Sequence, residues 1–355
     1  MTRLRAVVAG GAMLLALAAC HRDVEMAPLI DRKIYLTDKF YDVKALSPEK
    51  AIVVGYGGKI LTTNDSGRSW NVAQSNTDKA IYKVAMADET NGWAVGQGGT
   101  VLKTTDGGQT WQPMDAGTQS YLFSAFSLSP QHLIAVGDKS TIVQTTDGGA
   151  TWQVSKYEPP KQEDISDELL AGLDDAAVIA QEPSFYDVQF VDPNTGWIVG
   201  EFGKILKTTD GGKTWTEQQE SLLGGEIVDA LDLPTFFGID CVDANECVAV
   251  GLDGKIAGTK DGGATWAFED TGSDFSEPLF TVQIFPDGSG WAAGVAGEVM
   301  KRERGEWQQA DLGMRVFSWL RQVSFADENN GWLVGGFGLI LRTRDGGKTW
   351  IPAAA

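Results

Sequence analysis

Six aspartates recur in the same local sequence and are the first candidates for chemistry. Each lies in a segment of the form T-x-D-G-G-x-T-W or a close variant, and the six are Asp65, Asp106, Asp147, Asp210, Asp261 and Asp345. Carboxylates serve as general acids, nucleophiles or metal ligands only where such groups converge on one place. One carboxylate in each repeat would be spread around a ring. We therefore expect a structural role, in which each aspartate accepts backbone N–H bonds inside a tight turn.

The repeat that carries these aspartates predicts the fold. Its clearest copies are GWAVGQGGTVLKTTDGGQTW, ending at Trp111, and GWIVGEFGKILKTTDGGKTW, ending at Trp215. Six copies close on the tryptophans Trp70, Trp111, Trp152, Trp215, Trp266 and Trp350. A seventh copy, ending at Trp307, has lost the aspartate. Seven units of roughly forty residues, each with four short strands, predict an all-β, seven-bladed propeller. The aspartate segments resemble Asp-box repeats, which implies the sialidase-like superfamily.

Two longer spacings between the closing tryptophans indicate insertions in the linkers between blades. They fall at residues 156–184 and 217–234, within a propeller predicted to span residues 35–355. In a four-stranded blade these linkers share one face with the loops between strands two and three, and the Asp-boxes lie on the other face. Both insertions combine acidic and apolar residues. They are either solvated lids over the disc or a docking surface with apolar anchors inside an acidic rim.

Candidate partner-binding residues follow from the same repeat. Tyr56, Phe202 and Phe337 lie in the predicted loops between strands two and three. Equivalent positions of the first strands are expected to line the central channel, and these are Asp42, Lys83, Ser124, Asp187, Gly238, Thr281 and Gln322. Arg321 precedes the last of them. We take Asp42, Asp187 and Arg321 as further binding candidates, in a polar channel without a recognisable catalytic group.

The N-terminus predicts export and lipid anchoring. Arg3 and Arg5 precede an apolar run that is too short to span a bilayer and ends in L-A-A-C. This resembles the bacterial lipoprotein signal, which implies a signal peptide of residues 1–19, lipidation at Cys20 and a linker of residues 20–34. His21 stands where retention in the inner membrane would favour aspartate. The resemblance therefore implies the periplasmic face of the outer membrane.

Cysteine usage and charge support an exported binding protein. Beyond Cys20 only Cys241 and Cys247 remain, which predicts a structural disulfide in an oxidising compartment. The formal net charge of −19 argues against nucleic-acid binding, because an acidic surface repels phosphates. No residue pattern indicates a metal site or a cofactor. We expect a monomeric propeller that contacts a protein complex of the envelope or membrane.

The repeat resembles the BNR/Asp-box propellers, and the GWAVG and GWIVG strands resemble the photosystem II stability/assembly factor family. Gly92–Gly96 and Gly196–Gly200 carry this resemblance, each followed by an Asp-box. It implies a non-enzymatic assembly or stability scaffold that binds proteins. The resemblance supports the same fold for this chain more strongly than it supports a role in photosynthesis. A basic binding patch belongs to that family, and this acidic chain has no evident counterpart of it.

The main alternative is a glycan-binding protein or a glycoside hydrolase, since some glycosidases also use Asp-box propellers. Sialidases clamp a carboxylate with an arginine cluster, and none of the nine arginines after the signal peptide lies in the F-R-I-P context of sialidases. Paired carboxylates could serve another glycosidase, and Asp42 with Asp187 is the first pair to consider. We predict that the protein is not an enzyme.

Overall fold

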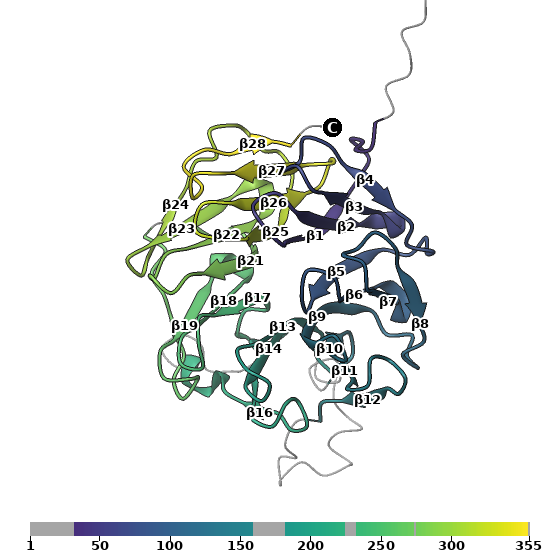
Figure 1. Cartoon of the computed structure of the whole chain (residues 1–355). Helices are drawn as coiled ribbons and strands as arrows, with labels where there is room; N and C mark the ends of the chain where they lie inside the picture. Colours follow the sequence, from purple (N-terminus) through teal and green to yellow (C-terminus); the bar gives the residue numbers. More distant parts are fainter. Residues whose placement is uncertain (1–31, 159–181, 224–231, 273–274, 354–355) are drawn as a thin grey trace, which may run out of the picture. The chain divides into compact units, whose positions relative to one another are not determined.

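The computed structural model describes residues 32–158, 182–223, 232–272 and 275–353, and Lys33–Ala355 form one compact unit. The described residues of this unit form seven four-stranded antiparallel sheets, which stand around a central opening (Figure 1). In each sheet the four strands lie side by side in chain order. The first strand of each sheet lies nearest the opening. The predicted all-β, seven-bladed propeller is confirmed.

The strand bounds of the first four blades follow the repeat. Blade 1 holds β1 (Phe40–Ala45), β2 (Ala51–Gly55), β3 (Ile60–Thr63) and β4 (Asn71–Ala73). Blade 2 holds β5 (Ile81–Met86), β6 (Gly92–Gly96), β7 (Val101–Thr104) and β8 (Gln112–Met114). Blade 3 holds β9 (Leu122–Ser129), β10 (His132–Gly137), β11 (Thr141–Thr145) and β12 (Gln153–Lys156). Blade 4 holds β13 (Phe185–Phe190), β14 (Gly196–Gly200), β15 (Ile205–Thr208) and β16 (Thr216–Glu217).

The remaining blades repeat this order. Blade 5 holds β17 (Phe236–Cys241), β18 (Cys247–Gly251), β19 (Ile256–Thr259) and β20 (Ala267–Phe268). Blade 6 holds β21 (Leu279–Ile284), β22 (Gly290–Gly294), β23 (Val299–Glu303) and β24 (Glu306–Gln309). Blade 7 holds β25 (Leu320–Phe325), β26 (Gly331–Gly335), β27 (Ile340–Thr343) and β28 (Ile351–Pro352). Short 3₁₀ turns are η1 (Tyr56–Gly58), η2 (Gln97–Gly99), η3 (Gln219–Leu222), η5 (Leu252–Gly254) and η6 (Val295–Gly297).

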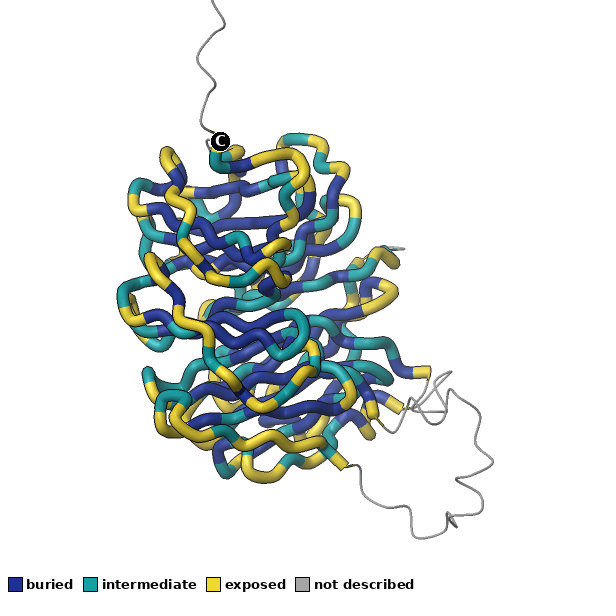
Figure 2. Tube along the Cα trace, turned by 90° about the vertical axis from the view of Figure 1, so that its right-hand side faces the viewer, coloured by how far each residue is buried: buried dark blue, intermediate teal, exposed yellow. Residues whose placement is uncertain are grey.

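Apolar side chains between neighbouring sheets form the core. The second strand of each blade is buried almost throughout, and exposure concentrates in the turns (Figure 2). The tryptophan that closes a repeat packs against the preceding blade. Trp152 meets Trp93 edge-to-face with ring centroids 5.8 Å apart, and Trp70 meets Trp332 in the same way at 5.7 Å. Such aromatic pairs add about 0.5–1.5 kcal/mol beyond the area they bury.

The Asp-box aspartates hold their own turns together. The Asp210 carboxylate accepts hydrogen bonds from the backbone N–H groups of Lys213 and Thr214, both at 2.9 Å, and from the Thr208 and Thr214 hydroxyls. Gly211 and Gly212 have φ of 76° and 85°, which a residue with a Cβ adopts at a cost. Hydrogen bonds of this kind from Ser69 lower the pKa of Asp65 to about 2. These contacts are those expected of a structural aspartate.

The two faces of the disc differ in the connections they carry. The Gly107 N–H donates to the Thr90 carbonyl, which joins an Asp-box turn to the turn between strands one and two. On the other side the Gln97 N–H donates to Ala80, which joins a strand-two-to-three loop to a blade linker. We call these two sides the Asp-box face and the loop face.

Side chains of the third strands connect four of the Asp-box turns to the blade before them. Lys103 of blade 2 donates to the Gly148 carbonyl of blade 3 at 2.8 Å, and Gln144 of blade 3 donates to Gly211 of blade 4 at 3.0 Å. Arg342 of blade 7 donates to Ser66 of blade 1 in the equivalent way. The first and last blades are thus joined by contacts between them, and their sheets exchange no strand.

Blade 6 lacks the Asp-box and is joined to blade 5 differently. Arg302 occupies the position that Thr208 has in blade 4, because both pair with the glycine that begins the second strand. The buried Arg302 guanidinium forms ion pairs with Glu246 at 3.0 Å and Glu269 at 3.3 Å, both from blade 5. Glu269 also accepts the Trp307 indole N–H at 2.6 Å. An ionic contact thus replaces the missing turn.

Candidate functional site

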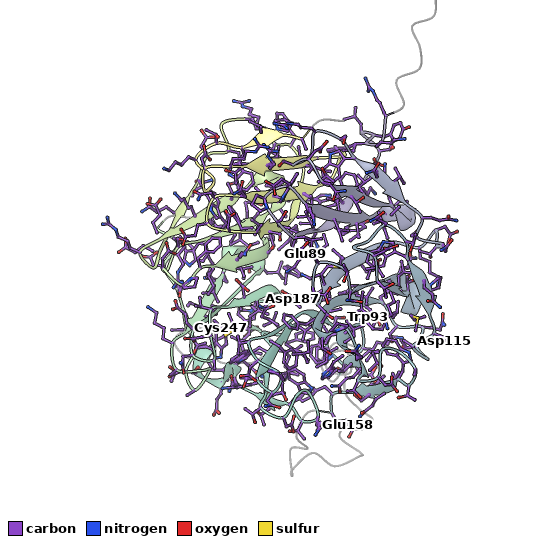
Figure 3. The ribbon with its side chains drawn as sticks, viewed as in Figure 1. Glu89, Trp93, Asp115, Glu158, Asp187 and Cys247 are labelled. Atoms are coloured by element: carbon purple, nitrogen blue, oxygen red, sulfur yellow. A yellow bond between two sulfur atoms is a disulfide. The ribbon has the colours of Figure 1, made fainter. Side chains whose placement is uncertain are left out.

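The innermost strands bring the predicted channel residues together. A cavity of about 260 Å³ lies at the centre of the ring and is lined in part by Asp42, Lys83, Asp187 and Gln322. Asp187 points toward the central opening (Figure 3). Its Oδ1 atom accepts a hydrogen bond from the Ser124 hydroxyl at 2.6 Å. Residues from five different blades therefore meet in one polar channel.

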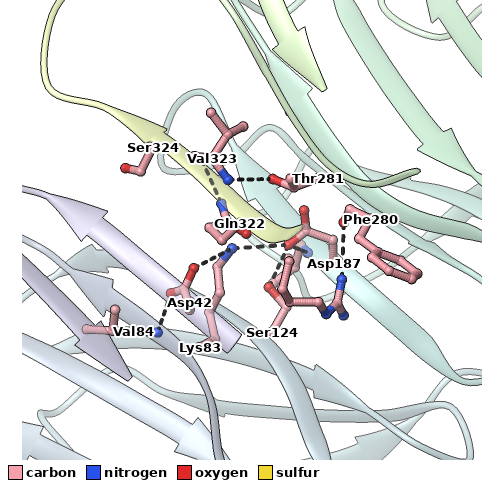
Figure 4. A network of polar contacts seen from close by, with 12 residues as sticks. Asp42, Lys83, Val84, Ser124, Asp187, Phe280, Thr281, Gln322, Val323 and Ser324 are labelled. Carbon is pink, nitrogen blue, oxygen red and sulfur yellow. Dashed lines mark hydrogen bonds and ion pairs between the residues drawn. The ribbon is translucent and has the colours of Figure 1, made fainter. Parts of the chain in front are cut away.

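Lys83 lies between the two candidate carboxylates. Its Nζ atom is 3.9 Å from Asp42 Oδ1 and 3.9 Å from Asp187 Oδ1 (Figure 4). Burial raises the pKa of Asp42, and the Lys83 ammonium opposes that rise. Burial acts to lower the pKa of Lys83, but Asp42 and Asp187 outweigh it, so the pKa of Lys83 is raised. The lysine therefore stays charged between the carboxylates.

The channel carboxylates also satisfy backbone donors of neighbouring blades. The innermost strand of a blade is an edge strand, whose free N–H groups need partners. The Val84 N–H donates to Asp42 Oδ2 at 2.7 Å, and the Ile239 N–H donates to Asp187 Oδ2 at 3.0 Å. The Ile284 N–H donates to Asp240 in the same manner at 2.8 Å. This use favours a structural role for Asp42 and Asp187 over that of a catalytic acid pair.

A ring of aromatic side chains stands next to the channel residues. The residue before each channel position is aromatic in six blades and arginine in the seventh. We call this set the collar, and its members are Tyr41, Tyr82, Phe123, Tyr186, Phe237, Phe280 and Arg321. All seven are partly exposed. Consecutive aromatic members have ring centroids 5.1 to 5.7 Å apart, so they form a continuous contact around the channel.

A β-bulge in every first strand creates the collar. The pairing of β1 with β2 skips Tyr41, between Phe40 and Asp42, and the first strands of the other blades are irregular at the same place. A bulge redirects a side chain, so a collar residue and the channel residue after it turn toward the same side. The bulge lies beside the loop face, because the Tyr56 N–H of η1 donates to the Lys39 carbonyl.

Arg321 completes the collar between blades 6 and 1. Its Cζ atom lies 5.2 Å from the Phe280 ring centroid, and its Nη1 atom donates to the Phe280 carbonyl at 3.2 Å. Burial lowers the pKa of Arg321, and the nearby carboxylates of Asp187 and Asp42 only partly oppose this lowering. Next to it, Tyr41 stacks on Trp319 with ring centroids 5.7 Å apart. The collar thus joins apolar rings to one guanidinium.

Exposed apolar side chains gather on the loop face. Among the described residues, eight large apolar side chains that are at least 36% exposed lie on loops or linkers of this face: Tyr35, Leu36, Tyr56, Tyr121, Leu223, Leu252, Phe317 and Phe337. The other three, Val72, Val154 and Ile351, lie on outermost strands. The described turns of the Asp-box face carry none. The loop face is therefore the better candidate for a protein-binding surface.

The structure places Tyr56, Phe202 and Phe337 in loops of that face. Tyr56 is 61% exposed and Phe337 is 64% exposed, but Phe202 is only partly exposed. Phe202 and Phe337 have φ of 55° and 58°, a left-handed conformation that strains an aromatic residue. Their binding role stays a prediction.

Cys241 and Cys247 form a disulfide that joins the ends of β17 and β18, with an S–S distance of 2.05 Å.

Of the second insertion, Leu222 and Leu233 are buried in the core between blades 4 and 5. Residues 159–181 of the first insertion, residues 224–231 of the second, the signal peptide and Cys20 lie outside the described residues. In the described part of the chain, no group of three or more His, Cys, Asp or Glu residues could hold a metal ion. Nor does any helix there have the length and apolar character to cross a membrane.

Known proteins resemble this chain in both sequence and fold. The family model described as "Photosynthesis system II assembly factor YCF48" matches residues 24–115, 68–159, 174–233 and 299–354. A "Photosystem II assembly lipoprotein Ycf48" of Nostoc sp. is 30% identical over 168 residues, 46% of each chain. The chloroplastic "Photosystem II stability/assembly factor HCF136" of Cyanidioschyzon merolae is 44% identical over 61 residues, 17% of this chain and 14% of its own. The Nostoc alignment therefore spans about half the length of the relative.

Solved structures share the fold at low sequence identity. "YCF48 from Cyanidioschyzon merolae" has a TM-score of 0.67 at 18% identity, covering 87% of this chain and 96% of its own. "YCF48 bound to D1 peptide" has a TM-score of 0.59 at 22% identity, covering 80% and 84%. An ancestral GH74 enzyme has a TM-score of 0.56 at 12% identity, covering 89% and 54%. The family model spans well over half of the chain, so this protein belongs to the YCF48 photosystem II assembly factor family.

Proposed function

We propose that this protein is a non-catalytic assembly or stability scaffold of the cell envelope, which binds a segment of a membrane protein complex. Membership of the YCF48 family supports this class of function. One solved YCF48 propeller is described as bound to a D1 peptide, so that relative binds a protein segment. The partner of this chain is a membrane protein with an accessible segment, and the propeller acts as a monomer.

The unequal distribution of apolar side chains carries the proposal. The collar and eight exposed apolar residues occupy the loop face, whereas hydrogen-bonded Asp-box turns occupy the opposite face. Protein interfaces are enriched in aromatic residues and arginine, especially at their centres. The collar provides both types at the centre of the disc. A partner segment that covers the channel mouth would stack apolar side chains on the rings of Tyr82, Phe123 and Phe237.

Arg321 supplies the polar part of this site. Its guanidinium donates one hydrogen bond to the Phe280 carbonyl and lies over the Phe280 ring. A guanidinium has five N–H donors in a planar fork that matches a carboxylate. We assign Arg321 to an acidic group of the partner, and the surrounding rings to the apolar side chains beside it. Asp42 and Asp187 hold Lys83 and the neighbouring backbone below this surface.

A lipid anchor on Cys20 would hold the scaffold at the membrane. Relatives from three organisms are named lipoproteins, which supports this assignment. We place the protein on the periplasmic face of the outer membrane because His21, and not aspartate, follows Cys20. Intact-mass measurement of the mature N-terminus tests lipidation. A free cysteine, or a chain cleaved elsewhere, would contradict it.

Glycan binding or hydrolysis is the second candidate, because the GH74 propeller shares the fold. That likeness concerns the fold alone. The channel carboxylates of this chain are engaged with Lys83 and with backbone N–H groups, which leaves them poorly suited to act as an acid and a nucleophile. A screen against polymeric glycans discriminates the two functions. Clear turnover by the purified protein would overturn the scaffold proposal.

Photo-cross-linking in intact cells tests the binding face. A photoreactive phenylalanine analogue at Phe237 probes the collar, and the same analogue at Lys213 probes an exposed Asp-box turn as a matched control. We expect a specific membrane protein to be captured from Phe237 and not from Lys213, with mass spectrometry identifying it. Capture from Lys213 alone would place the partner on the wrong face and would contradict the proposal.

A further inference from the structure

Five of the apolar side chains on the loop face are more than half exposed. They are Tyr35 (52%), Leu36 (81%), Tyr56 (61%), Phe317 (82%) and Phe337 (64%). Tyr35 and Leu36 precede β1, Tyr56 begins η1 of blade 1, Phe337 lies in the strand-two-to-three loop of blade 7, and Phe317 lies in the linker that enters blade 7. We call this set the seam patch, because it borders the junction between the last and first blades.

Direct contacts hold the segments of the seam patch together. The Gly338 N–H beside Phe337 donates to the Asp38 carbonyl at 2.8 Å, and the Tyr56 N–H donates to the Lys39 carbonyl at 2.9 Å. The segment of Phe317 joins them through Trp319, whose carbonyl accepts the Gly336 N–H at 3.2 Å. The segments that carry these five side chains therefore lie side by side and are fixed to one another by backbone hydrogen bonds.

The segments that build the seam patch are basic in an acidic protein. Residues 33–40, 56–59, 315–319 and 336–339 contain the cations Lys33, Lys39, Lys59 and Arg315 and one carboxylate, Asp38, whereas the whole chain has a formal charge of −19. Asp38 pairs with Lys59. Lys59 and Lys39 lie over the rings of Tyr35 and Tyr56, with Nζ to centroid distances of 5.1 and 5.6 Å. Aromatic rings beside lysine and arginine are typical of surfaces that lie in a membrane interface.

The position of the chain entry adds a second argument, which rests on the proposed lipidation of Cys20. The propeller unit begins at Lys33, two residues before Tyr35. A fully extended chain of the thirteen residues from His21 to Lys33 spans at most about 45 Å. The anchor would thus keep the seam patch within reach of the bilayer. A tether of this length leaves the disc free to turn, so the apolar and basic surface determines which face meets the lipid.

We propose that the seam patch binds the interface of an anionic membrane and thereby turns the loop face toward the bilayer. Leu36, Phe317 and Phe337 enter the boundary between headgroups and acyl chains, and Lys39 and Arg315 contact anionic headgroups. The acidic remainder of the molecule is repelled by the same lipids, which reinforces the orientation. The collar then faces the membrane, where a segment of a membrane protein can reach it.

Site-directed spin labelling of the lipidated, disulfide-bonded full chain tests the orientation. The nitroxide is attached at Phe317→Cys in the seam patch and, as a matched control, at Val154→Cys on outermost strand β12. On vesicles of phosphatidylcholine with phosphatidylglycerol, we expect the label at residue 317 to gain accessibility to oxygen and lose accessibility to a water-soluble nickel complex. The label at residue 154 should show aqueous behaviour. Equal aqueous accessibility at both positions would overturn the proposal.

Vesicle binding of the unlipidated full chain, Cys20→Ser, isolates the patch from the anchor. We expect measurable binding to vesicles with phosphatidylglycerol, at least about tenfold weaker binding to pure phosphatidylcholine, and a similar loss for Phe317→Ser with Phe337→Ser. The control pair Val154→Ser with Ile351→Ser should bind like the parent. Equal binding by the patch and control pairs would contradict the proposal, and circular dichroism excludes unfolding as the cause.

The proposed scaffold function and the proposed membrane contact of the seam patch can be refuted separately. If Cys20 is not lipidated, the proposed localisation fails, but binding of the Cys20→Ser chain to anionic vesicles still reports on the seam patch. If the patch variants lose membrane contact yet the analogue at Phe237 still captures the same membrane protein, the scaffold function stands without this orientation. If the analogue at Phe237 still captures the membrane protein while the nitroxides at residues 317 and 154 both stay in water, the membrane-contact proposal is refuted and the scaffold proposal is not.

Discussion

The Asp-box face and the loop face come from the same repeat but carry opposite kinds of side chain. On the Asp-box face, carboxylates and hydroxyls bond to their own turns, and third-strand side chains such as Lys103 reach the next blade. On the loop face, large apolar side chains reach solvent and the collar surrounds the channel. The Asp-box face stabilises the fold, whereas the loop face presents side chains that are free to bind.

Backbone geometry shows why the loop face can vary. The second residue of the strand-two-to-three loop has a left-handed φ between 53° and 68° in all seven blades, and it is Gly57, Gly98, Lys139, Phe202, Asp253, Ala296 or Phe337. The loop shape is thus nearly constant while the side chain changes from hydrogen to a phenyl ring. In an Asp-box turn such as that of Asp210, the carboxylate binds backbone N–H groups and hydroxyls of its own turn, so a change there removes contacts that support the fold.

The largest expected effect concerns blade 6, whose turn on the Asp-box face lacks the Asp-box sequence. Arg302→Ala should lower the free energy of unfolding by about 3–5 kcal/mol, because it leaves the partly buried carboxylates of Glu246 and Glu269 without their cation. Urea denaturation measures the change. Arg304→Ala, at an exposed position two residues on, should change it by less than about 0.5 kcal/mol. Equal effects for the two variants would show that blade 6 does not depend on the ionic contact.

A smaller loss is expected from an intact Asp-box. Asp210→Ala should lower the free energy of unfolding by about 1–2 kcal/mol, since two backbone N–H groups and two hydroxyls lose their acceptor. Burial acts to raise the pKa of Asp210, but these hydrogen bonds outweigh it and lower the pKa to about 2. The stabilisation is therefore present above the unfolded pKa of about 3.8 and is lost as pH falls toward 2.

Urea titrations of both proteins at pH 7, 4 and 2.5 measure this loss. The wild-type advantage should shrink between pH 4 and pH 2.5, and cross-linking from the analogue at Phe237 should be unaltered in Asp210→Ala. An unchanged advantage at pH 2.5, or loss of cross-linking in a folded variant, would break the division between a construction face and a binding face.

The blade number and the structural role of the Asp-box turns were predictable from the sequence. The spacing of the closing tryptophans gave seven blades, and the threonine, aspartate and glycines of the Asp-box gave a self-contained turn. Channel residues such as Asp42 and Lys83 followed from their equivalent places in the repeat. The role of Asp42 did not follow, because the Val84 N–H that donates to its carboxylate belongs to the next blade, about forty residues away.

The collar was missed for a physical reason. In a regular strand successive side chains point to opposite faces, so regular pairing would turn Tyr41 away from the channel if Asp42 points into it. The bulge removes that alternation. The signal was nevertheless present, as an aromatic residue before the channel position in six of the seven repeats. The substitute contact of Arg302 was equally hidden, since Glu246 and Glu269 come from separate segments of blade 5.

A moderate, pH-dependent effect is expected in the channel between the two faces. Burial raises the pKa of Asp240 to about 7, although the Ile284 N–H donates to it. The folded protein therefore binds a proton that the unfolded chain releases near pH 4, so the Asp240 carboxyl makes folding less favourable as pH rises from 4 to 7. Asp240→Asn, which keeps the acceptor oxygen, should gain stability relative to wild type at pH 8 and gain little at pH 4. Thermal denaturation at both pH values measures this, and a gain that is larger at pH 4 would contradict the assigned pKa.

The smallest effect on stability is expected at Phe337, an exposed residue with a left-handed φ. Phe337→Gly relieves a left-handed φ of 58°, worth about 1 kcal/mol, while the greater freedom of glycine in the unfolded chain offsets about 0.5–1 kcal/mol. The free energy of unfolding should therefore change by less than about 0.5 kcal/mol. Phe202→Gly relieves the same conformation but also removes a partly buried ring, so it should be the more destabilising of the two. Urea denaturation ranks them, and a larger loss for Phe337→Gly would mean that this ring supports the fold and is not free to bind.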